Sequence, residues 1–154
     1  MKTVLVVAAH PDDEILGVGG TVARHVAEGD EVYAVILGEG QTSRSDHREN
    51  ADQGLVEELH KNTLESAAAV GFREVFFAYF PDNRFDSVDL LDIVKTIEQM
   101  IHKLKPQIIY THYSGDLNVD HQCTARAVLT AARPIGAYCV EEIYAFETLS
   151  STEW

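Results

Sequence analysis

Apolar residues recur along this chain in two alternating patterns, as short continuous runs and as runs spaced by three or four positions. Continuous runs are typical of strands buried on both faces, and spaced runs of amphipathic helices. The continuous runs predict five strands, over residues 4–9, 31–37, 75–80, 107–112 and 142–147. The spaced runs predict four helices, over residues 14–28, 55–70, 88–104 and 121–133, and the polar stretch 38–54 predicts a long loop.

This alternation of strands and helices predicts an α/β fold, a Rossmann-like parallel sheet with helices on both faces, in a single domain over residues 1–154. In such sheets ligands bind beyond the carboxyl ends of the strands. The motif HPDDE follows the first strand, and polar loops follow Leu37, Phe80 and His112. We therefore expect the functional residues to gather at this edge of the sheet.

Composition and charge narrow the classes of partner. The net charge of the 154-residue chain is −13, from 25 acidic and 12 basic residues. Binding to phosphates needs clustered Lys and Arg, so this charge disfavours nucleic acid and anionic membrane surfaces. No apolar run approaches the roughly 20 residues of a membrane span, and the first apolar run leads into HPDDE without a cleavage site, which favours a buried strand over a signal peptide.

The two cysteines bear on the redox compartment of the protein. Cys123 and Cys139 lie far apart and form no CxxC pattern, which disfavours a structural zinc or a disulfide framework. This usage fits a reducing compartment, and we expect a cytoplasmic protein with a small-molecule substrate.

The first candidate chemistry lies directly after the first strand. His10 and Asp13 are three positions apart at a strand–helix junction, where a tight turn can point both side chains at one spot. One neutral imidazole and one carboxylate are common zinc ligands, and a catalytic site needs a third. His121, which follows a polar loop and begins a helix, is the best candidate. A metal ion would neutralise Asp13 and leave Asp12 to accept a proton from an activated water.

Three stretches carry a family resemblance: AHPDDE, the following GVGGT, and THYSGDLNVDHQ. Together they resemble the PIG-L/LmbE family of zinc-dependent N-deacetylases over nearly the whole chain. The resemblance implies a Rossmann-like fold and hydrolysis of an acetamide on an amino sugar. It also implies His10, Asp13 and His121 as metal ligands and Asp12 as the general base.

The chain departs from the family pattern in two respects. The family often has HPDH in the second motif, whereas Asn118 here takes the place of the first histidine, which would stabilise the oxyanion. An amide can donate a hydrogen bond but cannot act as an acid near pH 7, so Asn118 or His112 is the expected donor to the oxyanion and His112 is the candidate general acid. Asp120 is expected to orient an imidazole or to cap the helix. Family members usually continue beyond the last predicted strand, so we expect that a C-terminal segment is missing.

Candidate substrate contacts come from two loops. Asp82, Asn83 and Arg84 follow the third strand and suit sugar hydroxyls or a phosphate, and the long loop offers Arg44, His47 and Arg48. The glycines in GVGG lack the GxGxxG spacing and are interpreted as allowing close packing of a helix on a strand.

Alternatives to the deacetylase hypothesis stay open. One is a zinc amidase acting on another acyl amide, and another is a catalytically impaired, metal-binding relative. A nucleotide-binding module is disfavoured, because the glycine fingerprint is missing and Gly38, not an acidic residue, follows the second strand. Two histidines and an aspartate also suit Fe(II), Mn(II) or Co(II). The family often assembles, so a homo-oligomer is also expected as one state.

Overall fold

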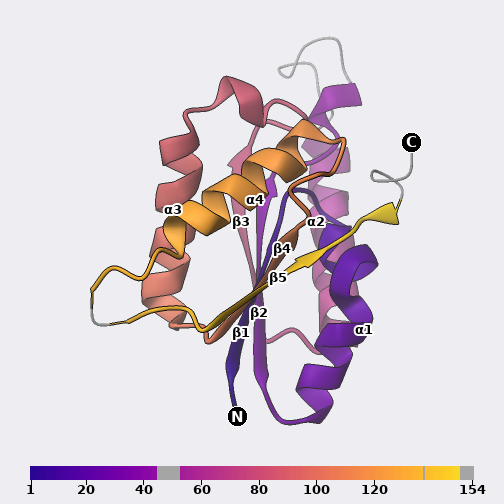
Figure 1. Cartoon of the computed structure of the whole chain (residues 1–154). Helices are drawn as coiled ribbons and strands as arrows, with labels where there is room; N and C mark the ends of the chain where they lie inside the picture. Colours follow the sequence, from indigo (N-terminus) through magenta and orange to yellow (C-terminus); the bar gives the residue numbers. More distant parts are fainter. Residues whose placement is uncertain (45–52, 137, 150–154) are drawn as a thin grey trace.

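The five predicted strands form one sheet in the computed structural model, which describes residues 1–44, 53–136 and 138–149 (Figure 1). The strands are all paired in parallel, in the order β3-β2-β1-β4-β5. Their bounds are β1 (Thr3–Ala8), β2 (Glu31–Gly38), β3 (Glu74–Phe80), β4 (Ile108–His112) and β5 (Glu142–Phe146).

Four α-helices connect the strands and cover both faces of the sheet, as the sequence predicts: α1 (Asp13–Ala27) and α2 (Gln53–Val70) on one face, α3 (Leu90–Leu104) and α4 (Val119–Ala131) on the other (Figure 1). Each face has its own core. Val18 and Val22 of α1 pack on one face, and Ile93 and Ile97 of α3 pack on the other.

The chain order of the strands places a topological switch point between β1 and β4. From β1 the sheet grows toward β2 and β3 on one side and toward β4 and β5 on the other. The connections after β1 and β4 therefore diverge, and in parallel sheets this switch point is where ligands bind. His10 follows β1 and His112 ends β4, so both histidines lie at this point.

Two glycines allow the close approaches that shape this edge. A side chain at Gly38 would meet the Ala9 carbonyl at 2.8 Å, so the end of β2 can lie against the turn that carries His10 only because this residue is glycine. A side chain at Gly17 would meet the Phe146 ring at 2.2 Å, which confirms close helix–strand packing for the first glycine of GVGG.

The long loop predicted over residues 38–54 is helical in two of its described parts. Residues Thr42–Arg44 form a turn of 3-10 helix, and α2 already begins at Gln53. The rest of the segment lies outside the described residues. Among the residues that the structure describes, no helix is both long and apolar enough to cross a membrane.

Candidate metal centre

Three elements bring His10, Asp13 and His121 together at the carboxyl edge of the sheet. His10 lies in the turn after β1, Asp13 is the first residue of α1, and His121 lies in the first turn of α4. The backbone N–H of His10 donates to the Asp13 carboxylate at 2.9 Å, which closes the turn. Asp13 and His121 are almost fully buried, at 3% and 1% exposure.

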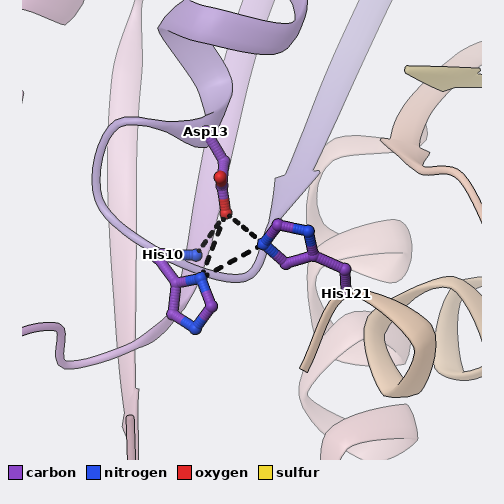
Figure 2. Close-up of side chains that lie close together, drawn as sticks. All are labelled: His10, Asp13 and His121. Atoms are coloured by element: carbon purple, nitrogen blue, oxygen red, sulfur yellow. Dashed lines mark hydrogen bonds and ion pairs between the residues drawn. The ribbon is translucent and has the colours of Figure 1, made fainter. Parts of the chain in front are cut away.

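The three side chains point toward one another (Figure 2). Asp13 Oδ2 lies 3.4 Å from His10 Nδ1 and 3.2 Å from His121 Nε2, and the two nitrogens are 3.3 Å apart. The three donor atoms thus form a nearly equilateral triangle. All three residues line one hollow of about 320 Å³, so the triangle faces open space.

This donor set fits a zinc ion. Zn²⁺ binds imidazole nitrogen and carboxylate oxygen at about 2.0–2.1 Å in tetrahedral geometry, which places neighbouring donors about 3.3 Å apart. The observed separations of 3.2 to 3.4 Å match that spacing. Three protein donors facing a hollow also leave a fourth position for water or substrate, as catalytic sites require.

Each imidazole of the triangle is held from behind by a buried carboxylate. His10 Nε2 lies 2.9 Å from Asp120 Oδ2, and His121 Nδ1 lies 2.9 Å from Asp116 Oδ2. Both carboxylates are completely buried. Such pairs orient metal-binding histidines and raise their basicity. The arrangement leaves His10 Nδ1 and His121 Nε2 to face the hollow.

The site is electrostatically built for a positive charge. Burial lowers the pKa of His10, but hydrogen bonds to Asp120 and Asp13 outweigh burial and raise it to about 10. Burial also opposes the shift at His121, whose pKa is raised by Asp13 and Asp116. Despite burial, hydrogen bonds from the histidines hold the pKa of Asp13 well below its usual value. The carboxylates therefore stabilise a cation between them.

Two further clusters near the triangle bring three ligand atoms together, but neither faces the hollow as a whole. One joins His112, Asp116 and His121, and the other joins His10, Asp82 and Asp120. In both, one atom pair is already a carboxylate–imidazole hydrogen bond of 2.9 Å. Asp116 and Asp120 are not among the described residues that line the hollow. Asp120 and Asp116 in these clusters therefore orient the imidazoles of His10 and His121.

Asp12 lines the same hollow and has a strained backbone. Its φ of 120° lies in a region that residues other than glycine rarely adopt. The side chain stands at the start of α1 without making a capping hydrogen bond, so capping does not explain the residue. The backbone N–H of Asp12 donates to Glu14 Oε2 at 3.0 Å. Strain of this kind costs about 1–3 kcal/mol and clusters at functional sites.

His112 lies behind the triangle. It is 1% exposed, is not among the described residues that line the hollow, and stacks on the His121 ring with centroids 3.8 Å apart. Its Nε2 accepts the Ala9 backbone N–H at 2.9 Å, and burial lowers its pKa. The same nitrogen lies 3.3 Å from Asp13 Oδ2, so the ring is engaged on the inner side of the triangle and does not reach the hollow, where a general acid would meet the substrate. This geometry argues against the expected general acid role.

Asn118 caps a helix at this edge. Its side-chain oxygen accepts the backbone N–H of Asp120 at 2.8 Å, and its amide nitrogen donates to Asn83 at 3.0 Å. Asn118 is therefore the N-cap of α4, a role that the sequence left open for Asp120. Asp120 instead binds His10 and accepts the Phe85 backbone N–H at 2.9 Å.

The predicted substrate residues separate into two groups. Asp82 and Asn83 line the hollow, and Asp82 is held there by the Ser43 hydroxyl at 2.6 Å and lies 3.4 Å from His10 Nε2. Arg84 is exposed and is not among the described residues that line it. Arg44 ends the 3-10 turn and its side chain is not described, and His47 and Arg48 lie outside the described residues.

The sequence interpretation gave no role to Asp116 or Glu14. Asp116 holds His121, and Glu14, which is fully buried, holds the strained turn at Asp12. Burial raises the pKa of Glu14 to about 7. Glu14 is the last residue of HPDDE. Its place directly after the predicted metal ligand Asp13 was the signal in the sequence that could have indicated a role in the site. Asp116 lies in an irregular loop with no spacing rule.

The chain matches a family model described as PIG-L, GlcNAc-PI de-N-acetylase, over residues 5–132. It is 26% identical to the uncharacterized deacetylase YaiS of Escherichia coli K12, covering 97% of this chain and 76% of YaiS. It is 30% identical to the probable N-acetyl-alpha-D-glucosaminyl L-malate deacetylase 2 of Bacillus cereus, covering 84% of this chain but only 60% of that relative.

A solved structure with the same fold shows that the fold alone does not define the reaction. This chain superposes on the 4-carboxy-2-hydroxymuconate hydratase GalB of Pseudomonas putida KT2440 with a TM-score of 0.78. The superposition covers 96% of this chain and 66% of GalB. Its sequence identity is 22%, so the likeness concerns the fold. Function must therefore be inferred from the residues of the site.

Proposed function

Because this chain belongs to the PIG-L (GlcNAc-PI de-N-acetylase) family, we propose that it is a zinc-dependent hydrolase that removes the N-acetyl group from an amino sugar or its conjugate. The observation that supports this most strongly is the triangle of His10 Nδ1, Asp13 Oδ2 and His121 Nε2, with edges of 3.2 to 3.4 Å facing a hollow. Its spacing suits zinc, and the hollow leaves room for the amide.

A divalent metal ion held by these residues would polarise the acyl carbonyl and lower the pKa of a water molecule. Asp12 is the general base: it lines the hollow and takes a proton as the water oxygen adds to the acyl carbon. The C–N bond then breaks, and the Asp12 carboxylic acid returns the proton to the amine nitrogen. The products are a carboxylic acid, which keeps the second water proton, and a free amine; at neutral pH that proton passes to the amine, which leaves a carboxylate and an ammonium ion.

Asp12 serves as both base and acid in this proposal because of where His112 lies. His112 is buried behind Asp13, and its Nε2 already accepts the Ala9 N–H. Asn118 keeps a structural role, since its oxygen caps α4 and its nitrogen holds Asn83. The presence of Asn118, where the family often has histidine, therefore leaves the general base and the three metal donors in place.

The sugar is expected to bind on the side of the hollow formed by Ser43, Asp82 and Asn83. Their carboxylate, amide and hydroxyl groups can exchange hydrogen bonds with sugar hydroxyls. Asp82 also contacts His10 at 3.4 Å, so a bound sugar would lie next to the metal donors.

The test is release of free amine from N-acetylglucosamine and its glycosides. Protein stripped with a chelator is compared with the same protein supplied with Zn²⁺, Fe²⁺, Mn²⁺ or Co²⁺. We expect no amine from the stripped protein and the fastest release with zinc. Amine release that persists without metal, or no release from any acetylated amino sugar with every metal bound, would contradict the proposal.

A further inference from the structure

An apolar groove continues from the metal-binding hollow between two helices. It has a volume of about 280 Å³ and lies between the first turn of α1 and the middle of α2, which are neighbours on one face of the sheet (Figure 1). The groove and the hollow share Pro11, Asp12 and Leu59 in their walls. The two spaces are therefore adjoining parts of one cleft.

The groove offers apolar surface from Pro11, Ile15, Leu16 and Leu59, although Asp12 and Asn62 also line it and two further residues carry hydroxyls. The Thr63 hydroxyl donates to the Leu59 carbonyl at 2.9 Å, and the Ser66 hydroxyl donates to the Thr63 carbonyl at 3.0 Å. Both hydroxyls are thus used within α2 and do not face the groove as donors. Ile15 and Leu16 of α1 form the opposite wall, and Leu16 is 63% exposed.

The polar and apolar walls lie in different parts of the cleft. Ser43, Asp82 and Asn83 line only the hollow, and the apolar side chains of Ile15 and Leu16 line only the groove, together with Asn62, Thr63 and Ser66 of α2. An N-acyl amino sugar has the same division, because its amide joins a polar sugar to an acyl chain. With the amide at the metal donors and the sugar on the polar wall, the acyl chain is directed past Asp12 into the groove.

We propose that this groove is a subsite for the acyl chain, and that the preferred substrates are N-acylated amino sugars with acyl chains longer than acetyl. This inference rests on the proposed function and adds the substrate class. The wall of α2 from Leu59 to Ser66 runs for about 10 Å at 1.5 Å per residue, which is long enough for a chain of several carbons. The reaction remains hydrolysis of the amide, giving a longer carboxylic acid and the same amine.

The first measurement compares N-acetyl-, N-hexanoyl- and N-octanoylglucosamine as substrates of the zinc-loaded protein. Fully burying one methylene strengthens binding about fourfold, and hexanoyl has four methylenes more than acetyl, so even partial burial should raise kcat/KM by roughly tenfold or more. The second measurement needs no turnover. Acetate, hexanoate and octanoate, the product carboxylates, are titrated calorimetrically into the same protein, and their affinities should rise in parallel.

The diagnostic variant is Leu16→Gln, and the matched control is Leu129→Gln on α4. Both leucines are exposed, at 63% and 57%, so neither change should disturb the core. We expect Leu16→Gln to reduce the octanoate-to-acetate affinity ratio by about threefold or more, and Leu129→Gln to leave it unchanged. Molecular mass in solution is measured for both variants.

The outcomes separate the subsite from the reaction. Amine release with no preference for longer chains, in rate or in affinity, would overturn the subsite and leave the hydrolase proposal intact. A chain-length preference in carboxylate affinity that Leu16→Gln removes, without amine release from any substrate, would support the subsite and contradict the hydrolase. A change of oligomeric state in Leu16→Gln with an unchanged affinity ratio would show that a second copy covers the groove, which would also overturn the subsite.

Discussion

The two ends of the parallel sheet use charged residues in opposite ways. At the carboxyl end, Asp13, Asp116 and Asp120 are at most 3% exposed and all contact histidines. At the amino end, pairs such as Lys2–Glu142 and Arg73–Glu31 are exposed. Burying charges costs free energy even when they are paired, whereas exposed pairs cost and contribute little. The buried network therefore indicates function.

Even the amino end contains one histidine–carboxylate pair, which makes a useful reference. His25 Nδ1 lies 2.8 Å from Asp30, and its Nε2 lies 3.0 Å from the Tyr110 hydroxyl. The pair resembles His121–Asp116 in geometry, but the third possible metal ligand beside it is the exposed Glu28, and the pair lines none of the hollows described above. Two pairs of similar geometry at opposite ends of the sheet can thus be compared directly.

The largest expected difference is between His121→Ala and His25→Ala. Removing His121 removes one corner of the metal triangle, so zinc binding should be lost and amine release should fall by at least about a thousandfold, since metal catalysis supplies several kcal/mol. His25→Ala should keep one zinc per chain and its activity. Metal analysis and initial rates of the two purified variants, with thermal unfolding to verify folding, provide the test. Equal zinc content in both variants would contradict the assignment.

The next effect concerns Asp12, which should matter for the reaction and not for the metal. Asp12→Asn should retain zinc and lose about 10²- to 10⁴-fold in kcat, the usual contribution of a general acid–base. Asp12→Gly should lose the same activity but raise the free energy of unfolding by about 1 kcal/mol, because glycine adopts the φ of 120° without strain. Denaturant unfolding of both metal-free variants measures this. A glycine variant less stable than the asparagine variant would refute the strain assignment.

A smaller effect is expected for the carboxylates behind the imidazoles. Asp116→Asn should weaken zinc binding about 10- to 100-fold, because loss of such a partner leaves the His121 ring less well oriented and less basic. Asp30→Asn, the matching change at the amino end, should leave zinc affinity unchanged. Competition titrations with a chromophoric chelator give both affinities. An unaltered zinc affinity in Asp116→Asn would mean that the Asp116–His121 hydrogen bond does not affect metal binding.

The smallest effect is expected at the exposed ion pairs. Arg73→Ala removes the contact with Glu31 at the amino end, where the Arg73 side chain is 61% exposed. The free energy of unfolding should change by at most about 1 kcal/mol, and zinc affinity and activity should stay the same. Denaturant unfolding beside the activity assay tests this, and a loss of activity would show that the two ends of the sheet are coupled.

The order of the elements and the location of the site could be predicted from the sequence because both follow from short-range patterns. Continuous apolar runs indicated the strands, and HPDDE directly after the first strand placed His10, Asp12 and Asp13 at the carboxyl edge. The meeting of His121 with these residues followed from parallel topology. The metal, catalytic and substrate roles themselves remain proposals.

What could not be predicted depends on packing between distant segments. The position of His112 behind Asp13 results from the Ala9 N–H that its ring accepts across the sheet. The role of Asp116 depends on the path of an irregular loop.

Anomalous X-ray diffraction at the zinc absorption edge, on crystals of the protein supplied with one equivalent of zinc, tests the central claim most directly. The account predicts one strong peak about 2 Å from His10 Nδ1, Asp13 Oδ2 and His121 Nε2. A peak instead at His10 Nε2, Asp82 and Asp120, or no peak at the carboxyl edge of the sheet, would contradict it.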